Sequence, residues 1–381
     1  MRTWLIAFIA VFGLAMSAVA QDPSGQGSDT VAKPKKKVVP NANTDATTPA
    51  APTSDSDNLP KIPSKLGNKA KDEAGSDVSF KADTSVVTVD VAVLDNKGNP
   101  IPKIPRGNFR ILEDNGPQTV TQYATAQAPM TVAVVVEFSN RFQATWSRGW
   151  FETLNAVYGF AQTLQKDDYI AVIAYDLRTE ILCDFTNDKN KVGEAMSRLR
   201  IPGFSESNMF DAIAETADRM QKIEGRKAIL LVTSGIDTFS KLTYDKCRKS
   251  LQESAVPVYS IGILQLARQM AEARGANTID FLQGDNELKT FAKETGGQAF
   301  FPRFQGEMPS VFMQINQALR NQYSLGYSPT NQSKDGKFRK ITVQLVNPTT
   351  NEPLRVTDEK GKPIKYTIIA KAGYTAPRAV E

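Results

Sequence analysis

The residues best suited to chemistry stand directly after the apolar run Val132 to Val136. They are Glu137, Ser139, Asn140 and Arg141, which offer a carboxylate, a hydroxyl, an amide and a guanidinium. A run that is apolar at every position must be covered on both faces, as in a central strand of a parallel sheet. Groups at the carboxyl end of such a strand face the crevice in which open α/β sheets bind ligands. We therefore expect a binding site at this loop.

The sequence excludes several kinds of catalytic site. The chain has no histidine, which removes Ser-His-Asp and Cys-His catalysis, histidine zinc ligands and histidine pH switches. No glycine-rich phosphate-binding motif follows a strand, so no nucleotide or other small-molecule substrate is indicated. Carboxylates remain as catalytic candidates, and the third hypothesis for this chain is a carboxylate-based hydrolase. The candidates are Asp167, Asp168, Asp184, Asp188 and Asp211.

These carboxylates also suit structural positions, so we expect the protein not to be an enzyme. Asp167 and Asp168 fit a loop before a strand. Asp211 fits the first turn of a helix, where a carboxylate stabilises the helix dipole.

Residues 1–20 have the pattern of a secretory signal. Met1 and Arg2 precede the apolar run Trp4 to Met16, and small residues lead to Ala20. This run is short for a membrane span of about 20 residues. We therefore expect cleavage after Ala20 and no transmembrane segment in the mature chain. The protein is expected to be secreted, in the periplasm or at the cell surface.

Residues 21–78 are rich in Pro, Ala, Thr, Ser, Asp and Lys and nearly lack aromatic residues. Such a composition cannot bury enough apolar surface to offset the entropy lost on ordering, so we expect a disordered tail or linker. The formal charge of the whole chain is only +5, and nucleic acid is not expected as a partner. Cys183 and Cys247 are expected on a strand and a helix, as two separate thiols.

The rest of the chain has short β segments on both sides of a region of alternating strands and helices. In the β segments we expect strands at 85–94, 109–113, 119–123, 323–327, 340–345 and 366–370. Between them we expect strands at 132–136, 169–175, 179–185, 227–233 and 256–263. Helices are expected at 150–164, 188–199, 209–223, 242–254, 287–294 and 308–321. Alternation of strand and helix is typical of a mostly parallel α/β sheet.

Neither β segment has enough strands to be stable alone. The predicted fold class is therefore α/β, with a Rossmann-like, doubly wound and mostly parallel sheet inserted in a discontinuous antiparallel β-sandwich. The predicted order is a signal peptide (1–20), a tail (21–78), the first part of the sandwich (79–130), the α/β domain (131–322), the second part of the sandwich (323–376) and a C-terminal tail (377–381).

Six motifs carry a family resemblance: VAVVVEFS, GRKAILLVTSGIDTFSKL, AVPVYSIGI, ETGGQAFF, NQYSLGYSP and DGKFRKITVQL, in this order. Through them the region from Thr131 to Tyr327 resembles a von Willebrand factor type A domain. The chain after the tail is similar to the secreted bacterial VWFA-related proteins. The resemblance implies that a metal-ion-dependent adhesion site at the top of the sheet binds a protein partner.

The family's metal site uses Asp-x-Ser-x-Ser on one loop, a Thr on a second loop and an Asp after a later strand. The matching residues here are Glu137, Ser139, Arg141, Ser207 and Ser234. The resemblance thus implies a degenerate Mg²⁺ site at Glu137, Ser139 and Ser207, whose oxygens are hard ligands. Arg141 has no acceptor and stays charged, which favours a metal-free loop and no cofactor. Asp237 matches a residue often found just after the late Asp.

We interpret the chain as a secreted, non-enzymatic, adhesion-type module that binds a protein through these loops. The expected partner-binding residues are Ser139, Arg141, Trp146, Ser207, Ser234 and Asp237. Arg141 would replace the metal by holding an acidic group of the partner. Trp146 and Trp150 have the composition of an interface hot spot, although Trp150 also suits packing of a helix onto the sheet. The alternative is an envelope scaffold protein that binds through the β-sandwich, with a vestigial metal-site loop.

Overall fold

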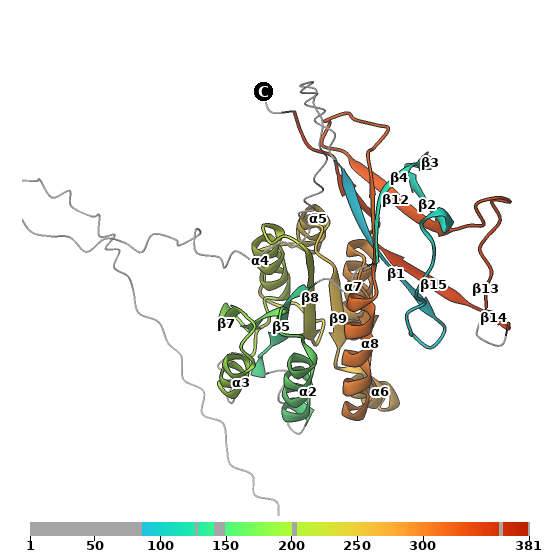
Figure 1. Ribbon diagram of the computed structural model, residues 1–381. Helices are drawn as coiled ribbons and strands as arrows, with labels where there is room; N and C mark the ends of the chain where they lie inside the picture. Colours follow the sequence, from blue (N-terminus) through green and yellow to red (C-terminus); the bar gives the residue numbers. More distant parts are fainter. Residues whose placement is uncertain (1–85, 126–128, 141–148, 200–203, 358–360, 380–381) are drawn as a thin grey trace, which may run out of the picture. The chain divides into compact units, whose positions relative to one another are not determined.

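The computed structural model describes residues 86–125, 129–140, 149–199, 204–357 and 361–379 (Figure 1). The predicted signal peptide and tail, together with Arg141 and Trp146, lie outside the described residues. The side chain of Trp150 also lies outside them. No helix in the described ranges is both long enough and apolar enough to cross a membrane.

A six-stranded sheet forms the centre of the α/β part, in the order β10-β9-β8-β5-β6-β7. Its strands are β10 (Ala299–Phe300), β9 (Val258–Gly262), β8 (Arg226–Thr233), β5 (Met130–Glu137), β6 (Tyr169–Tyr175) and β7 (Thr179–Thr186). All neighbours pair in parallel except β7, which pairs antiparallel with β6. With the antiparallel sheets beside it, this arrangement confirms the predicted fold class.

Strand β5 is buried at every position because helices cover both faces of the sheet. Val132, Val134 and Val136 belong to one core with α2 (Gly149–Thr163), α3 (Lys189–Ser197) and α8 (Met308–Arg320). Ala133 and Val135 belong to the opposite core with α4 (Met209–Gln221), α5 (Tyr244–Ser254) and α7 (Ile279–Thr295). The unbroken apolar run in the sequence is thus the signature of two covered faces.

Two helical features differ from the sequence-based expectation. Helix α6 (Gln265–Ala273) was not predicted, and its apolar residues Leu266 and Met270 are exposed. Helix α7 begins at Ile279 rather than at residue 287. Gly284 lies between these two starting points, and glycine in a sequence argues against a helix because it is a poor helix former. A Cβ at this position would stand 2.4 Å from the carbonyl oxygen of Gly235, so close packing requires a glycine inside the helix.

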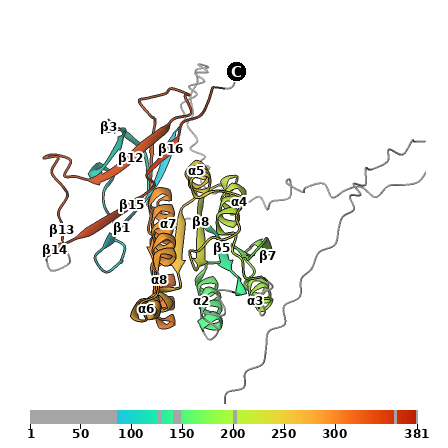
Figure 2. The ribbon, with the colours of Figure 1, turned by 180° about the vertical axis from the view of Figure 1, so that it is seen from behind.

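The other strands form antiparallel sheets that join residues from both ends of the described chain (Figures 1 and 2). One sheet has the order β15 (Tyr366–Ala370), β1 (Val87–Asp95), β11 (Tyr323–Tyr327) and β4 (Val120–Ala124). Another has the order β16 (Gly373–Thr375), β12 (Phe338–Leu345), β2 (Phe109–Glu113) and β3 (Gly116–Gln118). Strands β13 (Val356–Thr357) and β14 (Pro363–Ile364) form a small pair. A shared apolar core includes Val91 of the first sheet and Ile111 of the second.

The expected hairpin from residue 109 to residue 123 is only partly correct. Asp114 and Asn115 have the positive φ values, 47° and 70°, that a tight turn needs. The strand that returns beside β2 is however β3, while β4 pairs with β11 in the other sheet. Pairing of β4 with a strand about 200 residues later depends on tertiary structure, which the local pattern does not contain.

Hydrogen bonds to backbone carbonyl groups join the α/β part to the antiparallel sheets. The guanidinium of Arg226, at the start of β8, donates to the carbonyl oxygens of Leu319 (3.3 Å), Arg320 (3.0 Å) and Gln322 (2.8 Å), at the end of α8 and just before β11. The N–H of Ala372 donates to the carbonyl oxygen of Glu294 at 2.9 Å. These contacts lie at the amino ends of the parallel strands, so the carboxyl ends point away from the antiparallel sheets (Figure 1).

Candidate partner-binding loops

Four loops at the carboxyl ends of the parallel strands make up what we call the loop face: residues 138–140, 176–178, 204–208 and 234–243. Hydrogen bonds between backbone atoms connect them. The N–H of Asn140 donates to Phe204 at 2.6 Å, that of Asn208 donates to Asp176 at 2.8 Å, and that of Phe239 donates to Ser207 at 3.0 Å. Loops that are separate in the sequence therefore form one continuous surface.

Glu137 lies beneath this surface and is only 1 % exposed. One carboxylate oxygen accepts the hydroxyl of Ser139 at 2.8 Å. The other accepts the hydroxyl of Thr233 at 3.0 Å and the backbone N–H of Ser234 at 2.7 Å. The hydroxyl of Tyr175 lies 3.5 Å from the same oxygen and donates to Thr233 at 2.7 Å. The carboxylate thus joins the ends of β5, β6 and β8.

Tyr175 and Ser207 complete this buried network. Burial raises the pKa of Tyr175 well above 10, and the charge of Glu137 raises it further, so the phenol stays a neutral donor. The Ser207 hydroxyl is buried without a well-formed hydrogen bond. It nevertheless lies near enough to the Tyr175 hydroxyl to oppose the rise in that group's pKa.

Asp237 and Ser234 hold the loop that follows β8. Asp237 accepts the N–H of Phe210 at 3.2 Å and the hydroxyl of Ser240 at 2.5 Å. It thereby satisfies an N–H in the first turn of α4, whose N-cap residue Asn208 makes no side-chain cap bond. The pKa of Asp237 is raised above its usual value, because the effect of burial exceeds that of the hydrogen bonds, which lower it. The hydroxyl of Ser234 accepts the N–H of Ile236 at 3.2 Å.

The metal site that the family resemblance implies requires several free oxygen ligands. Hard divalent ions such as Mg²⁺ prefer carboxylate oxygens that can point at the ion. Of the implied ligands Glu137, Ser139 and Ser207, Glu137 offers the one carboxylate, and three donors already occupy it. Ser234 offers a hydroxyl where the family has an acid. Over the described ranges, no three His, Cys, Asp or Glu side chains gather as a metal would need. The donor set that is present does not fit Mg²⁺.

Two phenylalanines stand exposed on the rim of the loop face. Phe239 is 58 % exposed and Phe204 is 37 % exposed. The guanidinium of Arg178 lies over the Phe204 ring, 5.4 Å from its centroid. Exposed aromatic rings beside arginine are typical of residues that dominate binding energy in protein interfaces. The loop face therefore has chemistry suited to a protein partner.

Four of the five carboxylates considered as catalytic candidates, all except Asp167, have structural partners. Asp168 is buried and accepts the N–H of Met130 at 3.0 Å and the guanidinium of Arg320 at 2.6 Å. Asp211 accepts two backbone N–H groups of the loop after β8. Asp188 caps α3, and Asp184 pairs with Arg219 at 3.1 Å.

The structure brings Glu137, Ser139 and Ser234 together directly, and Ser207 and Asp237 lie on loops that border them. Sequence reasoning missed Thr233 and Tyr175, which contact the carboxylate. A signal for both exists, since each is a polar residue at the last position of its strand, directly after an apolar run. It also missed Phe204 and Phe239, because exposed aromatic residues in loops have no periodic pattern.

Comparison with known proteins adds a family match. Residues 132–307 match the family model for the von Willebrand factor type A domain. A search among curated proteins found no match. Among solved structures, proximal thread matrix protein 1 from the mussel byssus shares 14 % identity at a TM-score of 0.41, over 54 % of this chain and 50 % of that one. The present chain thus spans about half of that mussel protein.

Two bacterial structures are also similar. The conserved hypothetical protein BatB from Bacteroides thetaiotaomicron shares 14 % identity at a TM-score of 0.39, over 50 % of this chain and 98 % of that one. The vWF domain of the type V pili tip protein Mfa5 from Porphyromonas gingivalis shares 13 % identity at a TM-score of 0.37, over 51 % of this chain and 95 % of that one. With the family match and the observed order of strands and helices, residues 132–307 of this protein are a von Willebrand factor type A domain.

Proposed function

We propose that this protein is a secreted, non-enzymatic, adhesion-type module that binds a protein partner through the loop face. The observation that carries the proposal is the rim of exposed Phe204 and Phe239 above a buried and fully hydrogen-bonded Glu137. A free aromatic rim on a loop surface that backbone bonds hold together is a preorganised interface, which binds with little further loss of conformational entropy.

The proposed binding does not depend on a metal ion. Glu137 already accepts hydrogen bonds from Ser139, Thr233 and Ser234, which stabilise its charge without a cation. The positive charge that the ion would present comes instead from arginine. Arg178 is exposed on the rim, and Arg141 is the next residue after Asn140 in the sequence. A guanidinium can hold a carboxylate of the partner through two hydrogen bonds and stays charged at physiological pH.

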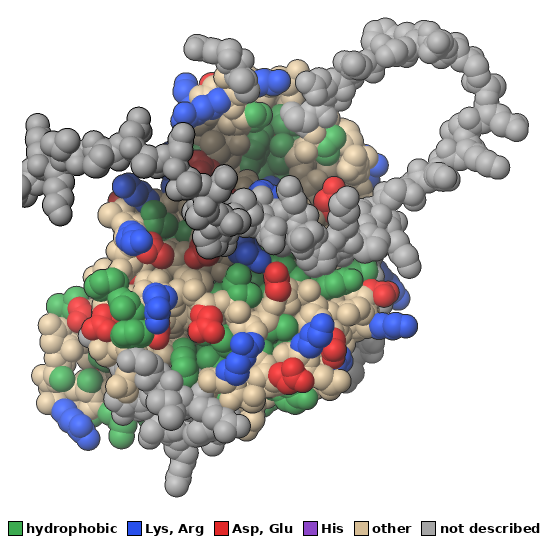
Figure 3. All heavy atoms as spheres, turned by 90° about the vertical axis from the view of Figure 1, so that its left-hand side faces the viewer, with side chains coloured by type: hydrophobic (Ala, Val, Ile, Leu, Met, Phe, Trp, Pro, Cys, Tyr) green, Lys and Arg blue, Asp and Glu red, His purple; other side chains and the backbone are tan. Residues whose placement is uncertain are grey.

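Nucleic acid is not the proposed partner. On the side of the molecule drawn in Figure 3, acidic and basic side chains are interspersed over the described surface. A nucleic-acid-binding face would instead show a stripe of one sign. Secretion is supported by the sequence of residues 1–20. Mass spectrometry of the exported protein should show an N-terminus at Gln21.

The loop face is tested by quantitative pull-down from a cell-envelope extract with purified full-length protein. The variants are Phe239→Ala and Arg141→Ala, and the matched control is Met313→Ala, because Met313 is 54 % exposed on α8, outside the loops of the loop face. Wild type and control should capture the same protein, and both loop variants should lose it. Capture should survive a chelator and weaken as salt screens the arginine charge.

Two outcomes would contradict the proposal. Equal capture by the loop variants and the wild type would move the contact to the antiparallel sheets, as the scaffold alternative holds. Loss of capture in the chelator would show that a metal ion takes part.

A further inference from the structure

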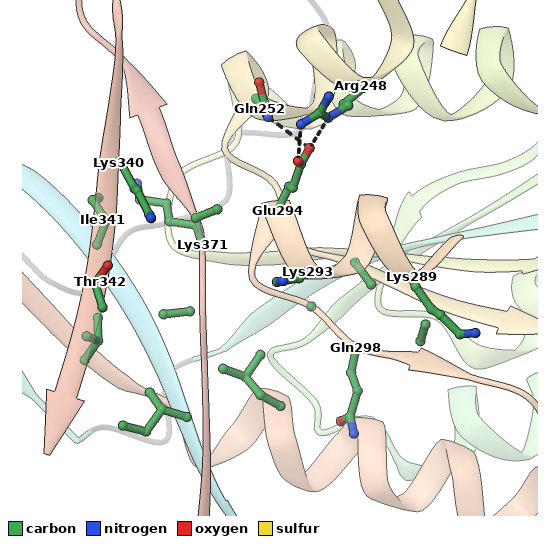
Figure 4. Close-up of a pocket in the computed structure, with 18 of the residues that line it drawn as sticks. Arg248, Gln252, Lys289, Lys293, Glu294, Gln298, Lys340, Ile341, Thr342 and Lys371 are labelled. Atoms are coloured by element: carbon green, nitrogen blue, oxygen red, sulfur yellow. Dashed lines mark hydrogen bonds and ion pairs between the residues drawn. The ribbon is translucent and has the colours of Figure 1, made fainter. Parts of the chain in front are cut away.

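A groove of about 1030 Å³ lies between helices α5 and α7 on one side and strands β12 and β15 on the other (Figure 4). It is at the opposite end of the parallel strands from the loop face, near the contact of Ala372 with Glu294. Its lining combines apolar side chains of the sheet core, such as Ile341 and Ile368, with long basic side chains. The groove is therefore a second candidate site, separate from the one proposed above.

Basic residues outnumber acidic ones along this groove, six to two. Lys340 and Lys371 come from the strand side, and Lys293 comes from α7 (Figure 4). Among the described residues, none of these three lysines has an ion-pair partner within 4.0 Å. The excess positive charge is therefore available to a ligand.

Glu294, one of the two acidic residues that line the groove, already has partners. Glu294 accepts Arg248 at 2.6 Å and Gln252 at 2.9 Å, as the dashed lines in Figure 4 mark. Lys371 is half-buried, and burial lowers its pKa, while the charge of Asp90 opposes this effect. A half-buried ammonium without a bonded counter-ion costs stability, so a bound anionic group would relieve a cost that the protein carries alone.

The backbone of the groove offers a free strand edge. Among the described strands, residues 341–345 of β12 pair only with β2, because β16 pairs with β12 at residues 338–340. At the far end of this edge the C=O of Leu345 accepts the N–H of Leu354 at 3.0 Å. The N–H of Ile341 points to the β16 side, since it donates to Ala372 at 2.8 Å. By the alternation of antiparallel strands, the N–H and C=O of Val343 point to that same side, where no described strand pairs with them. Likewise, no described strand pairs with the edge of β15 opposite β1.

We propose that this groove binds an extended acidic peptide segment of another protein, which adds as a strand beside β12 and places its carboxylates on Lys340, Lys371 and Lys293. Addition of a strand to a free sheet edge is a general mode of peptide recognition, in which backbone bonds give affinity and side-chain pockets give specificity. Alternate apolar residues of the peptide would cover the partly exposed Val343 and Ile368, because side chains in a strand alternate between its faces. An extended peptide satisfies the free backbone groups, the apolar floor and the lysines together.

The test uses the full-length protein and a fluorescein-labelled octapeptide of alternating valine and glutamate, measured by fluorescence anisotropy. The variant Lys340→Glu/Lys371→Glu should bind at least about tenfold more weakly, because like charges now face each other. The control Lys191→Glu, an exposed lysine on α3, should bind as the wild type does. A peptide N-methylated at alternate residues keeps its charge but loses strand hydrogen bonds, and it should also bind about tenfold more weakly.

Four results would overturn the proposal. Equal affinity for the alternating valine–lysine peptide would remove the charge argument, and equal affinity for the N-methylated peptide would remove the strand argument. Binding of laurate with no binding of the peptide would make the groove a site for anionic amphiphiles. Peptide binding that appears only after Asp72→Lys, Glu73→Lys and Asp77→Lys are introduced would mean that the chain's own N-terminal segment is the occupant. The loop variants Phe239→Ala and Arg141→Ala should not change peptide affinity, which keeps the two sites distinguishable.

Discussion

Replacement of Glu137 distinguishes a structural carboxylate from a metal ligand. Glu137→Ala removes the acceptor of three hydrogen bonds, from Ser139 at 2.8 Å, Thr233 at 3.0 Å and Ser234 at 2.7 Å. Glu137→Gln keeps the length and one oxygen of the side chain but removes its charge. Each buried donor that is left unsatisfied costs roughly 1–3 kcal/mol.

The magnitudes follow from which donors can find another acceptor. The hydroxyls of Ser139 and Thr233 rotate, and that of Thr233 already lies 3.4 Å from the sulfur of Met209. The backbone N–H of Ser234 cannot rotate, so its hydrogen bond is lost outright. We expect Glu137→Ala to lower the free energy of unfolding by about 2–4 kcal/mol. In Glu137→Gln a neutral oxygen still accepts from Ser234, and we expect a loss of about 1 kcal/mol.

The assay is urea unfolding at neutral pH, with thermal unfolding as a second measurement, in the presence of Mg²⁺ and of a chelator. A loss of 1 kcal/mol lowers the Tm by about 2–4 °C in a domain of 150–250 residues. The matched control is Glu180→Gln, an exposed carboxylate on the neighbouring strand β7, which should leave stability unchanged. Mg²⁺ should not change the Tm of any variant.

A metal ligand would behave in the opposite way. A carboxylate held for a cation is an uncompensated buried charge when the cation is removed, so its neutralisation stabilises the protein. Two results together would refute the reasoning. Glu137→Gln would be more stable than the wild type in the chelator, and the Tm of the wild type would rise in Mg²⁺.

Three further predictions concern single residues outside this network. In the native protein Cys247 should resist thiol labelling at pH 8, because it is buried and burial raises its pKa. The half-buried Cys183 should label slowly. Both thiols should label after unfolding without reductant. Lys371→Met should raise the free energy of unfolding by about 0.5–2 kcal/mol at pH 7. The pKa of this lysine is lowered on folding, so the gain should shrink as pH rises towards 10.5 and the wild-type ammonium loses its proton; a gain that persists at pH 11 would contradict this. Gly296→Ala should lower the free energy of unfolding by about 1–3 kcal/mol. The residue has φ +84°, and a Cβ on it would stand 2.6 Å from the backbone nitrogen of Lys371. A variant as stable as the wild type in urea would contradict the observed contact.

The local pattern of the sequence was sufficient for most strands and helices of the α/β part. Burial of both faces of β5 follows from five consecutive apolar residues at Val132 to Val136, and the position of the candidate loop follows from the end of that run. Such patterns are informative because the period of a strand or helix decides which side chains face the core. The start of helix α7 and the partner of strand β4 were predicted wrongly, because the surroundings of Gly284 and of β4 come from residues distant in the sequence.

Only the tertiary structure decided what each polar residue of the site contacts. Thr233 lies 96 residues from Glu137 in the chain, yet the parallel register that pairs Val136 with Val232 places the two side by side. The groove lined by Lys293, Lys340 and Lys371 likewise depends on α7 and on strands β12 and β15. These elements meet only when the antiparallel sheets pack against the α/β part. Sequence periodicity encodes the face on which a side chain lies, whereas its partners are set by strand register and packing between distant segments, which no local window contains.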